Sequence, residues 1–449
     1  MSKLFGTDGI RGEANIYPMT PDIAFRVGRA VAYVFRNKRE KHKILVGKDT
    51  RLSCYMFEHA IAAGITSMGV NTYLVGPMPT PAIAFLVRNM RADAGIIISA
   101  SHNPFNDNGI KFFSKEGKKL PMKIEHEIEK LTLSDEINHI RPTGKNIGKV
   151  FRVRDTLGRY VVYAKSTFPE NLSLNGLRVV IDCANGATYK VAPIIFEELG
   201  AEVFPINIDP NGTNINEKCG SLHPSCIQEA TKVYRADIGI SFDGDGDRVL
   251  FCDENQEIVD GDETMAILAK HMKQKNKLSK NTVVATIMSN LGLERFLKKE
   301  QITLIRTDVG DRNIAQLMFA NGYNLGGEQS GHIVLSDFNP TGDGVVTALQ
   351  VLSIMKEEGK KLSEMKREFI RIPQRTKSVY VSKKIPLDEI KEIKDVIDEA
   401  EKTLSNKGRI IVRYSGTEPV VRIAGESEDK NALNTCIDNI SDVLRRCLL

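Results

Sequence analysis

Short apolar runs alternate with helix-like stretches along the first 330 residues of the chain. In the first segment KILVGKDTR (43–51) precedes a helix-like stretch that ends at Ser67, and NTYLVG (71–76) follows. A second helix-like stretch at 83–90 then leads into RADAGIIIS (91–99). Apolar runs of strand length that alternate with helical stretches of about 10 to 15 residues predict βαβ units and mostly parallel sheets.

The same alternation returns twice. The second copy begins with RVVIDCANGA (178–187) and ends with RADIGISF (235–242), which repeats the lead-in of the first copy. A fainter third copy begins with TVVATIMSNLG (282–292), continues with ITLIRTDVGD (302–311) and ends with YNLGGEQSGH (323–332). A spacing of about 100 residues indicates duplicated domains, because solenoid repeats are much shorter.

The pattern changes near Arg371, where hairpin-type strands and two charged, helix-like stretches follow. We therefore predict an α/β protein with three similar α/β domains, whose sheets are mixed and mostly parallel, and a smaller C-terminal α+β domain. We place the four domains around a central cleft. Their expected bounds are 1–153, 154–254, 255–370 and 371–449.

Polar sequences follow the last strand of each copy: SASHNP (99–104), DGDGDR (243–248) and GGEQSGH (326–332). Ligands of open α/β sheets bind beyond the carboxyl ends of the parallel strands. We therefore expect the three polar loops to face one shared cleft.

Composition narrows the class of protein. The chain has 449 residues, of which 41% are hydrophobic and 27% charged, and a net charge of +5 without long basic runs. This argues against nucleic acid and membrane partners and suits anionic phosphate esters. Seven cysteines without a C-x-x-C pair, and no long apolar segment, lead us to expect a cytoplasmic protein.

DGDGDR places Asp243, Asp245 and Asp247 on one tight loop. Three crowded carboxylates repel one another unless a hard cation such as Mg²⁺ neutralises them. A calcium EF-hand is a weaker interpretation, because its required glycine at position six is Arg248 here. A purely structural aspartate turn is the remaining alternative.

Ser101 and His102 lie in the loop that the repeat places opposite the aspartates. Ser, Asn and Pro are common turn residues, so an ordinary turn is the simplest reading of SASHNP taken alone. A serine hydrolase is excluded because no G-x-S-x-G sequence is present. The repeat geometry favours a role for Ser101 as nucleophile or phosphate carrier beside the cation.

Two further loops carry candidate ligands for a sugar phosphate. In GGEQSGH, Glu328 and Ser330 suit sugar hydroxyls and His332 can exchange protons near neutral pH. RYSGTEPVVR (413–422) can wrap a phosphate, although it is no P-loop. The expected phosphate ligands are Arg413, Ser415, Gly416, Thr417 and Arg422.

Several other residues complete the predicted site. Arg11, Lys111 and Arg248 are candidate charge stabilisers, and Lys111 and His332 can move protons between Ser101 and a sugar hydroxyl. Thr307 and Gly310, in ITLIRTDVGD, are added to the substrate-binding set. A substrate held by a phosphate at one end while its other end exchanges a phosphoryl group at Ser101 would need mainly positioning and charge neutralisation.

With SASHNP, DGDGDR, GEQSGH and RYSGTEP in this order, the chain resembles the α-D-phosphohexomutase superfamily over its full length. The resemblance implies an isomerase that transfers phosphate within its substrate, with Ser101 as the phosphoserine and a catalytic set that includes His102. One Mg²⁺ per subunit would be bound by Ser101, Asp243, Asp245 and Asp247, and a hexosamine 1,6-bisphosphate would serve as primer and intermediate.

FGTDGIRG (5–12) and the GEQSGH variant are most similar to the family members that interconvert glucosamine 6-phosphate and glucosamine 1-phosphate for UDP-N-acetylglucosamine and cell-wall synthesis. Mannose or glucose phosphates are the alternative substrates. A hydrolase of the aspartyl-phosphate type and a non-catalytic sugar-phosphate binding module are further alternatives. The sequence leaves the oligomeric state open, with a homodimer as one outcome.

Overall fold

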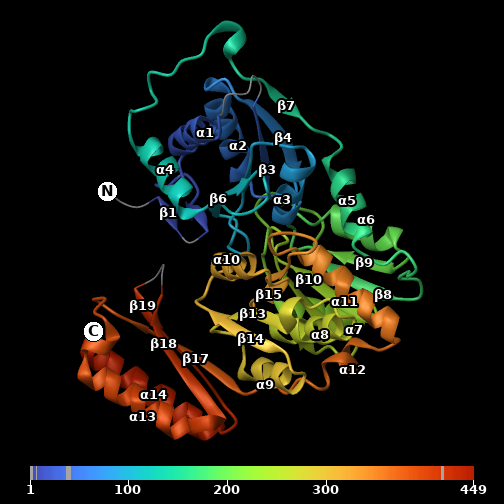
Figure 1. Cartoon of the computed structure of the whole chain (residues 1–449), viewed down its shortest axis with the longest axis vertical. Coiled ribbons are helices and arrows are strands. Elements are labelled where there is room, and N and C mark those ends of the chain that lie inside the picture. The colour runs from blue at the N-terminus through green and yellow to red at the C-terminus, as the bar shows by residue number, and fades with distance from the viewer. Residues whose placement is uncertain (1–3, 7, 37–41, 416–418) are drawn as a thin grey trace. The chain divides into compact units, whose positions relative to one another are not determined.

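The computed structural model describes residues 4–6, 8–36, 42–415 and 419–449. The chain forms two compact units, coloured along the sequence in Figure 1. Unit 1 comprises Met1–Ile287 and Ile302–Arg367, and unit 2 comprises Met288–Gln301 and Glu368–Leu449. Gly416 and Thr417, two of the predicted phosphate ligands, lie outside the described residues.

Unit 1 contains three sheets, and each is built on the same four-strand core. The first sheet has the order β1 (Phe5–Gly6), β2 (Gly9–Glu13), β6 (Asp107–Ser114), β5 (Ala94–Ile98), β3 (Lys43–Lys48), β4 (Asn71–Pro77) and β7 (Val150–Arg152). The second has the order β12 (Ile258–Val259), β11 (Val249–Asp253), β10 (Ile238–Phe242), β8 (Arg178–Asp182) and β9 (Glu202–Ile206). The third has the order β14 (Thr303–Thr307), β13 (Thr282–Thr286), β15 (Leu325–Gly327) and β16 (Ile333–Leu335).

In each core the first strand pairs in parallel with the second and third, and the third pairs antiparallel with the fourth. The parallel strands are β3, β4 and β5, then β8, β9 and β10, then β13, β14 and β15. The antiparallel partners are β6, β11 and β16. The predicted α/β class, the mixed sheets and the threefold repeat are therefore confirmed.

Helices cover these sheets. They are α1 (Pro21–Phe35), α2 (Ser53–Ser67), α3 (Thr80–Asn89), α4 (Met122–Leu133), α5 (Thr156–Ser166), α6 (Val191–Glu198), α7 (Pro224–Val233), α8 (Gly261–Gln274), α10 (Asp311–Asn321), α11 (Gly344–Glu358) and α12 (Leu362–Lys366). In the first domain α1, α2 and α4 pack together and share one hydrophobic cluster with the sheet, while α3 packs against β3 and β5 (Figure 1).

The repeated RAD lead-in has a structural role. Arg91 and Arg235 each lie two residues after the end of a helix and have a positive φ, of 52° and 49°. The aspartate two residues later accepts a hydrogen bond from the first backbone N–H of the neighbouring strand. Asp93 binds Lys43 N at 2.9 Å, and Asp237 binds Arg178 N at 2.8 Å. The same short sequence thus sets the start of the third strand in both domains.

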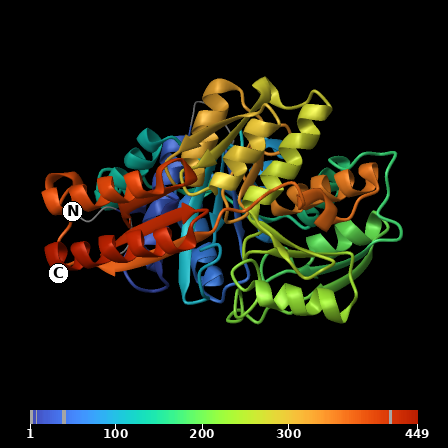
Figure 2. The ribbon, with the colours of Figure 1, turned by 90° about the horizontal axis from the view of Figure 1, so that it is seen from below.

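Unit 2 is an α+β domain in which α13 (Lys391–Leu404) and α14 (Lys430–Leu448) pack on an antiparallel sheet (Figures 1 and 2). The strand order is β17 (Gln374–Tyr380), β19 (Val420–Ser427) and β18 (Gly408–Tyr414), and β18 and β19 form the predicted hairpin. This smaller C-terminal domain is also as predicted.

Helix α9 (Leu291–Lys299) follows β13 in the sequence but is part of unit 2. The Phe296 ring lies 6.3 Å from that of Phe369. Leu291 N donates to Glu426 at 2.8 Å, across 135 residues of sequence. Nothing in the repeating pattern indicates this assignment, because it depends on contacts with residues made much later in the chain.

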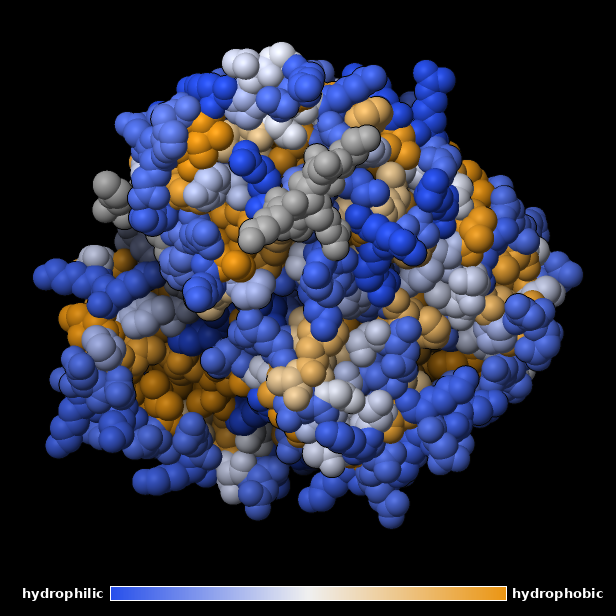
Figure 3. All heavy atoms as spheres, turned by 45° about the horizontal axis from the view of Figure 1, so that its top comes forward, coloured by the Kyte–Doolittle hydropathy of each residue, from blue (hydrophilic) through white to orange (hydrophobic). Residues whose placement is uncertain are grey.

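Among the described residues, no helix combines the length and apolar character needed to cross a membrane. Figure 3 shows a face covered mainly by hydrophilic side chains, with separate hydrophobic patches between them.

Candidate active site

The loops that follow β5, β10 and β15 in unit 1 contain Ser101, the three aspartates and the predicted sugar loop. Ser101, three residues after the end of β5, is only 3% exposed. Its Oγ donates to Asp243 Oδ2 at 2.6 Å, across 142 residues of sequence. The serine loop of the first domain and the aspartate loop of the second therefore meet, as the repeat predicts.

The three aspartates lie within the protein at exposures of 1%, 0% and 5% for Asp243, Asp245 and Asp247. One carboxylate oxygen from each can be chosen so that all three lie within 4.8 Å of one another. Burial and repulsion from Asp247 and Asp245 raise the pKa of Asp243 well above its usual value. Such a cluster could hold a metal ion.

The hydrogen bonds around the cluster support this interpretation. Asp245 Oδ2 accepts from Thr80 Oγ1 at 2.7 Å and from Lys111 Nζ at 3.1 Å. By contrast, Asp245 Oδ1 and Asp247 Oδ1 are buried and have no hydrogen-bond partner among the described residues. Buried carboxylate oxygens normally have partners, and hard divalent cations take oxygen ligands of this kind. The donor set therefore fits a hard divalent cation.

Lys111 is the main protein cation at the cluster. Its Nζ lies 3.1 Å from both Asp8 and Asp245 and 3.7 Å from Asp247. Burial opposes the charged form, but the carboxylates of Asp245, Asp8 and Asp247 outweigh burial and raise the pKa of Lys111. The ammonium group therefore stays charged at neutral pH.

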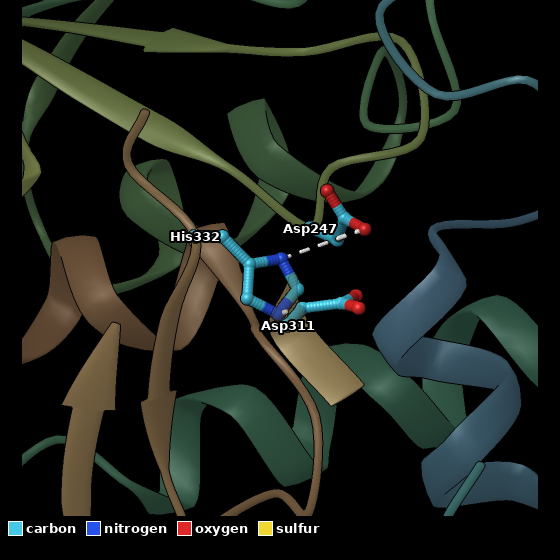
Figure 4. Close-up of side chains that lie close together, drawn as sticks. All are labelled: Asp247, Asp311 and His332. Carbon is cyan, nitrogen blue, oxygen red and sulfur yellow. Dashed lines mark ion pairs between the residues drawn. The ribbon is translucent and has the colours of Figure 1, made fainter. Parts of the chain in front are cut away.

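His332 lies between two carboxylates from different elements, as Figure 4 shows. Its Nδ1 is 3.6 Å from Asp247 Oδ2, and its Nε2 is 3.8 Å from Asp311 Oδ2. Burial opposes protonation, yet Asp247 and Asp311 together raise the pKa of His332. These three residues are a second group that could hold a metal. We interpret them as an ion-pair chain, because each ring nitrogen of His332 faces one carboxylate and Asp311 also pairs with Lys119.

The series of ion pairs that begins at His332 extends to residues of the first domain. Lys119 Nζ forms ion pairs with both Asp311 and Asp8. Burial alone would raise the pKa of Asp8, but Lys111, Lys119 and Arg11 lower it well below its usual value. Alternating charges thus connect His332 with Lys111.

His102 and the two predicted arginines lie beside Ser101 and the aspartates. His102 Nδ1 is 3.3 Å from Ser101 Oγ. Burial, together with the positive charges of Arg248 and Arg11, lowers the pKa of His102 to about 4. Arg248 N donates to Asp243 Oδ1 at 3.1 Å, and the Arg11 side chain pairs with Asp8 at 3.1 Å and is 30% exposed.

The predicted sugar loop also has internal order. Glu328 Oε1 accepts from Gly310 N at 3.2 Å, and Glu328 Oε2 accepts from Ser330 Oγ at 3.2 Å. Thr307 ends β14, and its hydroxyl donates to Asp308 O at 3.0 Å. Three of the four residues predicted to bind sugar here are therefore directly connected.

In unit 2, Arg413 and Arg422 are direct cross-strand partners on β18 and β19, so their side chains share one face of the sheet. Ser415 is buried, its N–H donates to Val420 O at 2.8 Å, and its carbonyl accepts from Lys384 Nζ at 2.9 Å. The described part of RYSGTEPVVR thus contributes two arginine side chains, and Lys384 adds a third cation beside it.

Several residues in contact with the predicted set were missed from the sequence. They are Asp8, Arg51, Thr80, Ser99, Asn216 and Asp311, and two more, Asp49 and Lys119, pair with members of this group. Asp8 and Asp311 adjoin predicted residues, and their position in FGTDGIRG and TDVGD was a usable signal. Thr80 and Lys119 gave no signal, because their partners lie 165 and 192 residues away.

The comparisons with known proteins agree with this geometry. Models of the phosphoglucomutase/phosphomannomutase family match residues 2–138 (α/β/α domain I), 159–257 (domain II), 260–372 (domain III) and 376–443 (C-terminal domain). The chain therefore belongs to the phosphoglucomutase/phosphomannomutase family and is a mutase of the isomerase class.

Within this family the chain is similar to a phosphoglucosamine mutase from Geotalea uraniireducens (strain Rf4), at 53% identity over 446 residues that cover 99% of this chain and 98% of the relative. A family protein from Burkholderia thailandensis has a similar structure, with a TM-score of 0.80, 22% identity and coverage of 99% and 97%. Aspergillus fumigatus N-acetylphosphoglucosamine mutase, in complex with GlcNAc-6P and magnesium, has a TM-score of 0.69, 18% identity and coverage of 100% and 96%.

Proposed function

We propose that the chain acts as a phosphoglucosamine mutase, interconverting glucosamine 6-phosphate and glucosamine 1-phosphate. The observation that carries the proposal is the buried hydrogen bond of 2.6 Å from Ser101 Oγ to Asp243. In the same cluster, Asp245 and Asp247 each have a carboxylate oxygen without a hydrogen-bond partner among the described residues. The 53% identity to a phosphoglucosamine mutase supports this choice of sugar.

Ser101, Asp243, Asp245 and Asp247 would hold one Mg²⁺. Bound there, the cation neutralises negative charge on the phosphoryl group during transfer. Lys111 provides a permanent positive charge at the same place, because its raised pKa keeps the ammonium protonated. The guanidinium groups of Arg11 and Arg248 contribute further positive charge at the edge of the cluster.

Ser101 carries the phosphate, supplied at first by a hexosamine 1,6-bisphosphate primer. A sugar hydroxyl oxygen forms the new bond to phosphorus while the bond from phosphorus to Ser101 Oγ breaks, which leaves a sugar bisphosphate in the site. The hydroxyl proton passes to a base, and Ser101 Oγ recovers a proton. The bisphosphate then turns, and its other phosphate returns to Ser101.

His102 and His332 differ in their suitability for this proton movement. His102 is neutral at pH 7, since its pKa is lowered to about 4, and it lies 3.3 Å from Ser101 Oγ. It can share a hydrogen bond with Ser101, but the lowered pKa makes it a weak base. His332 has a raised pKa and two carboxylate neighbours, so it suits proton donation or charge stabilisation.

The sugar would be bound by Thr307, Gly310, Glu328 and Ser330, and the distal phosphate by Arg413, Ser415, Gly416, Thr417 and Arg422. The paired arginines on β18 and β19 support the second assignment, since guanidinium groups bind phosphate oxygens in pairs. The four domain bounds, a cytoplasmic location and a homodimer stay proposals of the same kind.

Phosphomannomutase or phosphoglucomutase activity is the alternative, because one small substituent at carbon 2 distinguishes these sugars. We expect the highest kcat/KM with glucosamine 6-phosphate when it is compared with glucose 6-phosphate and mannose 6-phosphate. A higher value for mannose 6-phosphate would contradict the choice of sugar while leaving the mutase activity intact.

The phosphoserine is tested by intact-mass measurement. The protein should carry one phosphate after incubation with a hexose 1,6-bisphosphate, and Ser101→Ala should carry none and lose turnover. Ser166→Ala, on the exposed surface of α5, is the matched control and should behave as the parent does. An active protein that never carries phosphate on Ser101 would sink the proposal, as would ligand binding without isomer formation.

A further inference from the structure

A buried arginine holds the backbone of the proposed phosphoserine. Arg51, in the loop between β3 and α2, has no exposed surface. Its guanidinium donates to Ser101 O at 3.0 Å, Asn103 O at 2.7 Å and Asp107 O at 2.9 Å, and to Asp49 Oδ2 at 3.2 Å. One side chain therefore binds three backbone carbonyls of the serine loop.

The contacts close into a ring around Ser101. The Ser101 N–H donates to Ser99 Oγ at 2.9 Å, and Ser99 Oγ donates to Asp49 Oδ2 at 2.6 Å. Asp49 in turn pairs with Arg51, which binds the Ser101 carbonyl. Both polar backbone atoms of Ser101 are thus fixed by the same group of three side chains.

This ring stabilises an unfavourable backbone. Ser101 has φ 52°, in the left-handed region that residues other than glycine rarely adopt. A serine in that conformation reverts to a more common one unless its surroundings fix it, and any such change would move Oγ away from Asp243. The 2.6 Å contact between these two atoms therefore depends on the ring.

A second side chain binds the same carbonyls from another domain. Asn216, in the second repeat, is 7% exposed, and its Nδ2 donates to Ser101 O at 2.9 Å and to Asn103 O at 3.0 Å. The aspartate loop packs directly on this contact. A Cβ at Gly244 would lie 2.7 Å from both Ser101 O and Asn216 Nδ2, so only glycine fits between Asp243 and Asp245.

We propose that Arg51 and Asn216 are positioning residues for phosphoryl transfer, which hold the carbonyls of Ser101 and Asn103 from two domains and so aim Ser101 Oγ at the aspartate cluster. Neither side chain donates a hydrogen bond to the reacting Oγ. They act through the backbone of Ser101.

The expected consequence is a loss of turnover without loss of substrate binding. Phosphoryl transfer depends on alignment of the attacking and leaving oxygens, and small misplacements are costly. Among the described residues, the hydrogen bonds of Thr307, Gly310, Glu328 and Ser330 do not involve the ring, so KM should change little. The expected changes in kcat and KM rest on the proposed function.

Arg51→Lys is the first variant, because lysine keeps a positive charge beside buried Asp49 but cannot reach four acceptors. We expect kcat to fall about 100-fold or more and KM for glucosamine 6-phosphate to stay within about threefold. Asn216→Ala, which removes no charge, should lower kcat about tenfold or more by the same route.

Arg29→Lys is the matched control. Arg29 is also a buried arginine of the first domain, 2% exposed, and it donates to two backbone carbonyls, Ile137 O at 2.6 Å and Ile140 O at 3.2 Å. It has no contact with Ser101. Arg29→Lys should lose comparable stability and keep kcat within about twofold.

Two readouts separate a positioning role from a structural one. The first is the single-turnover rate at which Ser101 takes phosphate from hexose 1,6-bisphosphate, measured by intact mass on folded protein. The second is hydrogen exchange of the Ser101 amide, which should be faster in Arg51→Lys than in Arg29→Lys. The exchange measurement needs no catalysis, so it still tests the ring if the proposed function fails.

The inference is overturned if folded Arg51→Lys and Asn216→Ala transfer phosphate at the parental rate. It is also overturned if the decrease in kcat of Arg51→Lys and Asn216→Ala is no larger than that of Arg29→Lys. A rise in KM with unchanged kcat would overturn it as well.

Discussion

At the scale of single residues, His102 has a pKa that makes the stability of the protein depend on pH. Burial and the charges of Arg248 and Arg11 lower its pKa from 6.5 to about 4 in the folded chain. The unfolded chain therefore binds a proton between these values while the folded chain does not. The contribution of His102 to the free energy of unfolding therefore decreases as pH falls from about 6.5 to about 4, by at most about 1.4 kcal/mol per pH unit.

We predict that His102→Asn weakens this pH dependence. Denaturant unfolding of the protein, freed of phosphate and metal, should show a smaller loss of stability in the variant between about pH 6.5 and about pH 4.5. His59→Asn, on the exposed side of α2, is the control and should keep the parental dependence. Equal slopes for His102→Asn and the parent protein would contradict the prediction.

Sequence patterns predict the residues of each local motif but not the residues that support them. Ser101 and the three aspartates are recognisable because each sits in a short polar loop after a strand, and the repeat aligns the loops. By contrast, the local sequence around Lys119, Asp311 and Arg51 contains no pattern that marks a supporting role. Their roles arise from contacts such as that between Lys119 and Asp311, 192 residues apart, which requires the folded arrangement of two domains.

At the scale of elements, α10 connects the sugar loop with the first domain. The residue before its first turn, Gly310, donates to Glu328, and Arg312 within that turn binds Leu120 O at 3.1 Å and Glu125 at 2.5 Å. The Arg312 and Glu125 side chains are only 12% and 9% exposed. Removing one partner of such a pair leaves an uncompensated charge in a poorly solvated place.

We predict that Arg312→Met lowers the free energy of unfolding by about 3 kcal/mol or more, because the buried Glu125 carboxylate loses the guanidinium that pairs with it. Combining it with Glu125→Gln should recover a large part of the loss, which a double-mutant cycle by denaturant unfolding would measure. Arg159→Met, which breaks an exposed pair with Asp155 at 41% and 61% exposure, should change stability by less than about 1 kcal/mol. Similar losses for both single variants would contradict the prediction.

At the scale of the whole molecule, the chain divides into two units with separate hydrophobic cores. The aspartate cluster lies entirely in unit 1. We therefore predict two unfolding transitions in calorimetry. Mg²⁺ should raise the transition temperature of unit 1 and leave that of unit 2 unchanged. At a Mg²⁺ concentration of about 100 times its dissociation constant, binding would increase the free energy of unfolding of unit 1 by about 2.7 kcal/mol.

Asp245→Asn tests this assignment, because it removes one cluster charge and leaves unit 2 untouched. Its unit 1 transition should respond weakly to Mg²⁺, and chelation should abolish mutase turnover in the parent protein until Mg²⁺ is restored. The location of the site would be contradicted if Mg²⁺ raised both transition temperatures equally. It would also be contradicted if Mg²⁺ raised the unit 1 transition temperature of Asp245→Asn as much as that of the parent protein.

The membership of α9 in unit 2 has a consequence for synthesis and for engineering. Leu293, Phe296 and Leu297 of this helix are buried, and the Phe296 ring lies near that of Phe369 in the same unit, whose remaining residues begin only at Glu368. During synthesis, the segment 302–367 of unit 1 is therefore made after α9 and before the residues of unit 2 that begin at Glu368. A gene shortened after residue 367 would remove Phe369 and the other residues of unit 2 that follow it, so a soluble fragment that contains unit 1 alone requires a polar linker in place of residues 288–301.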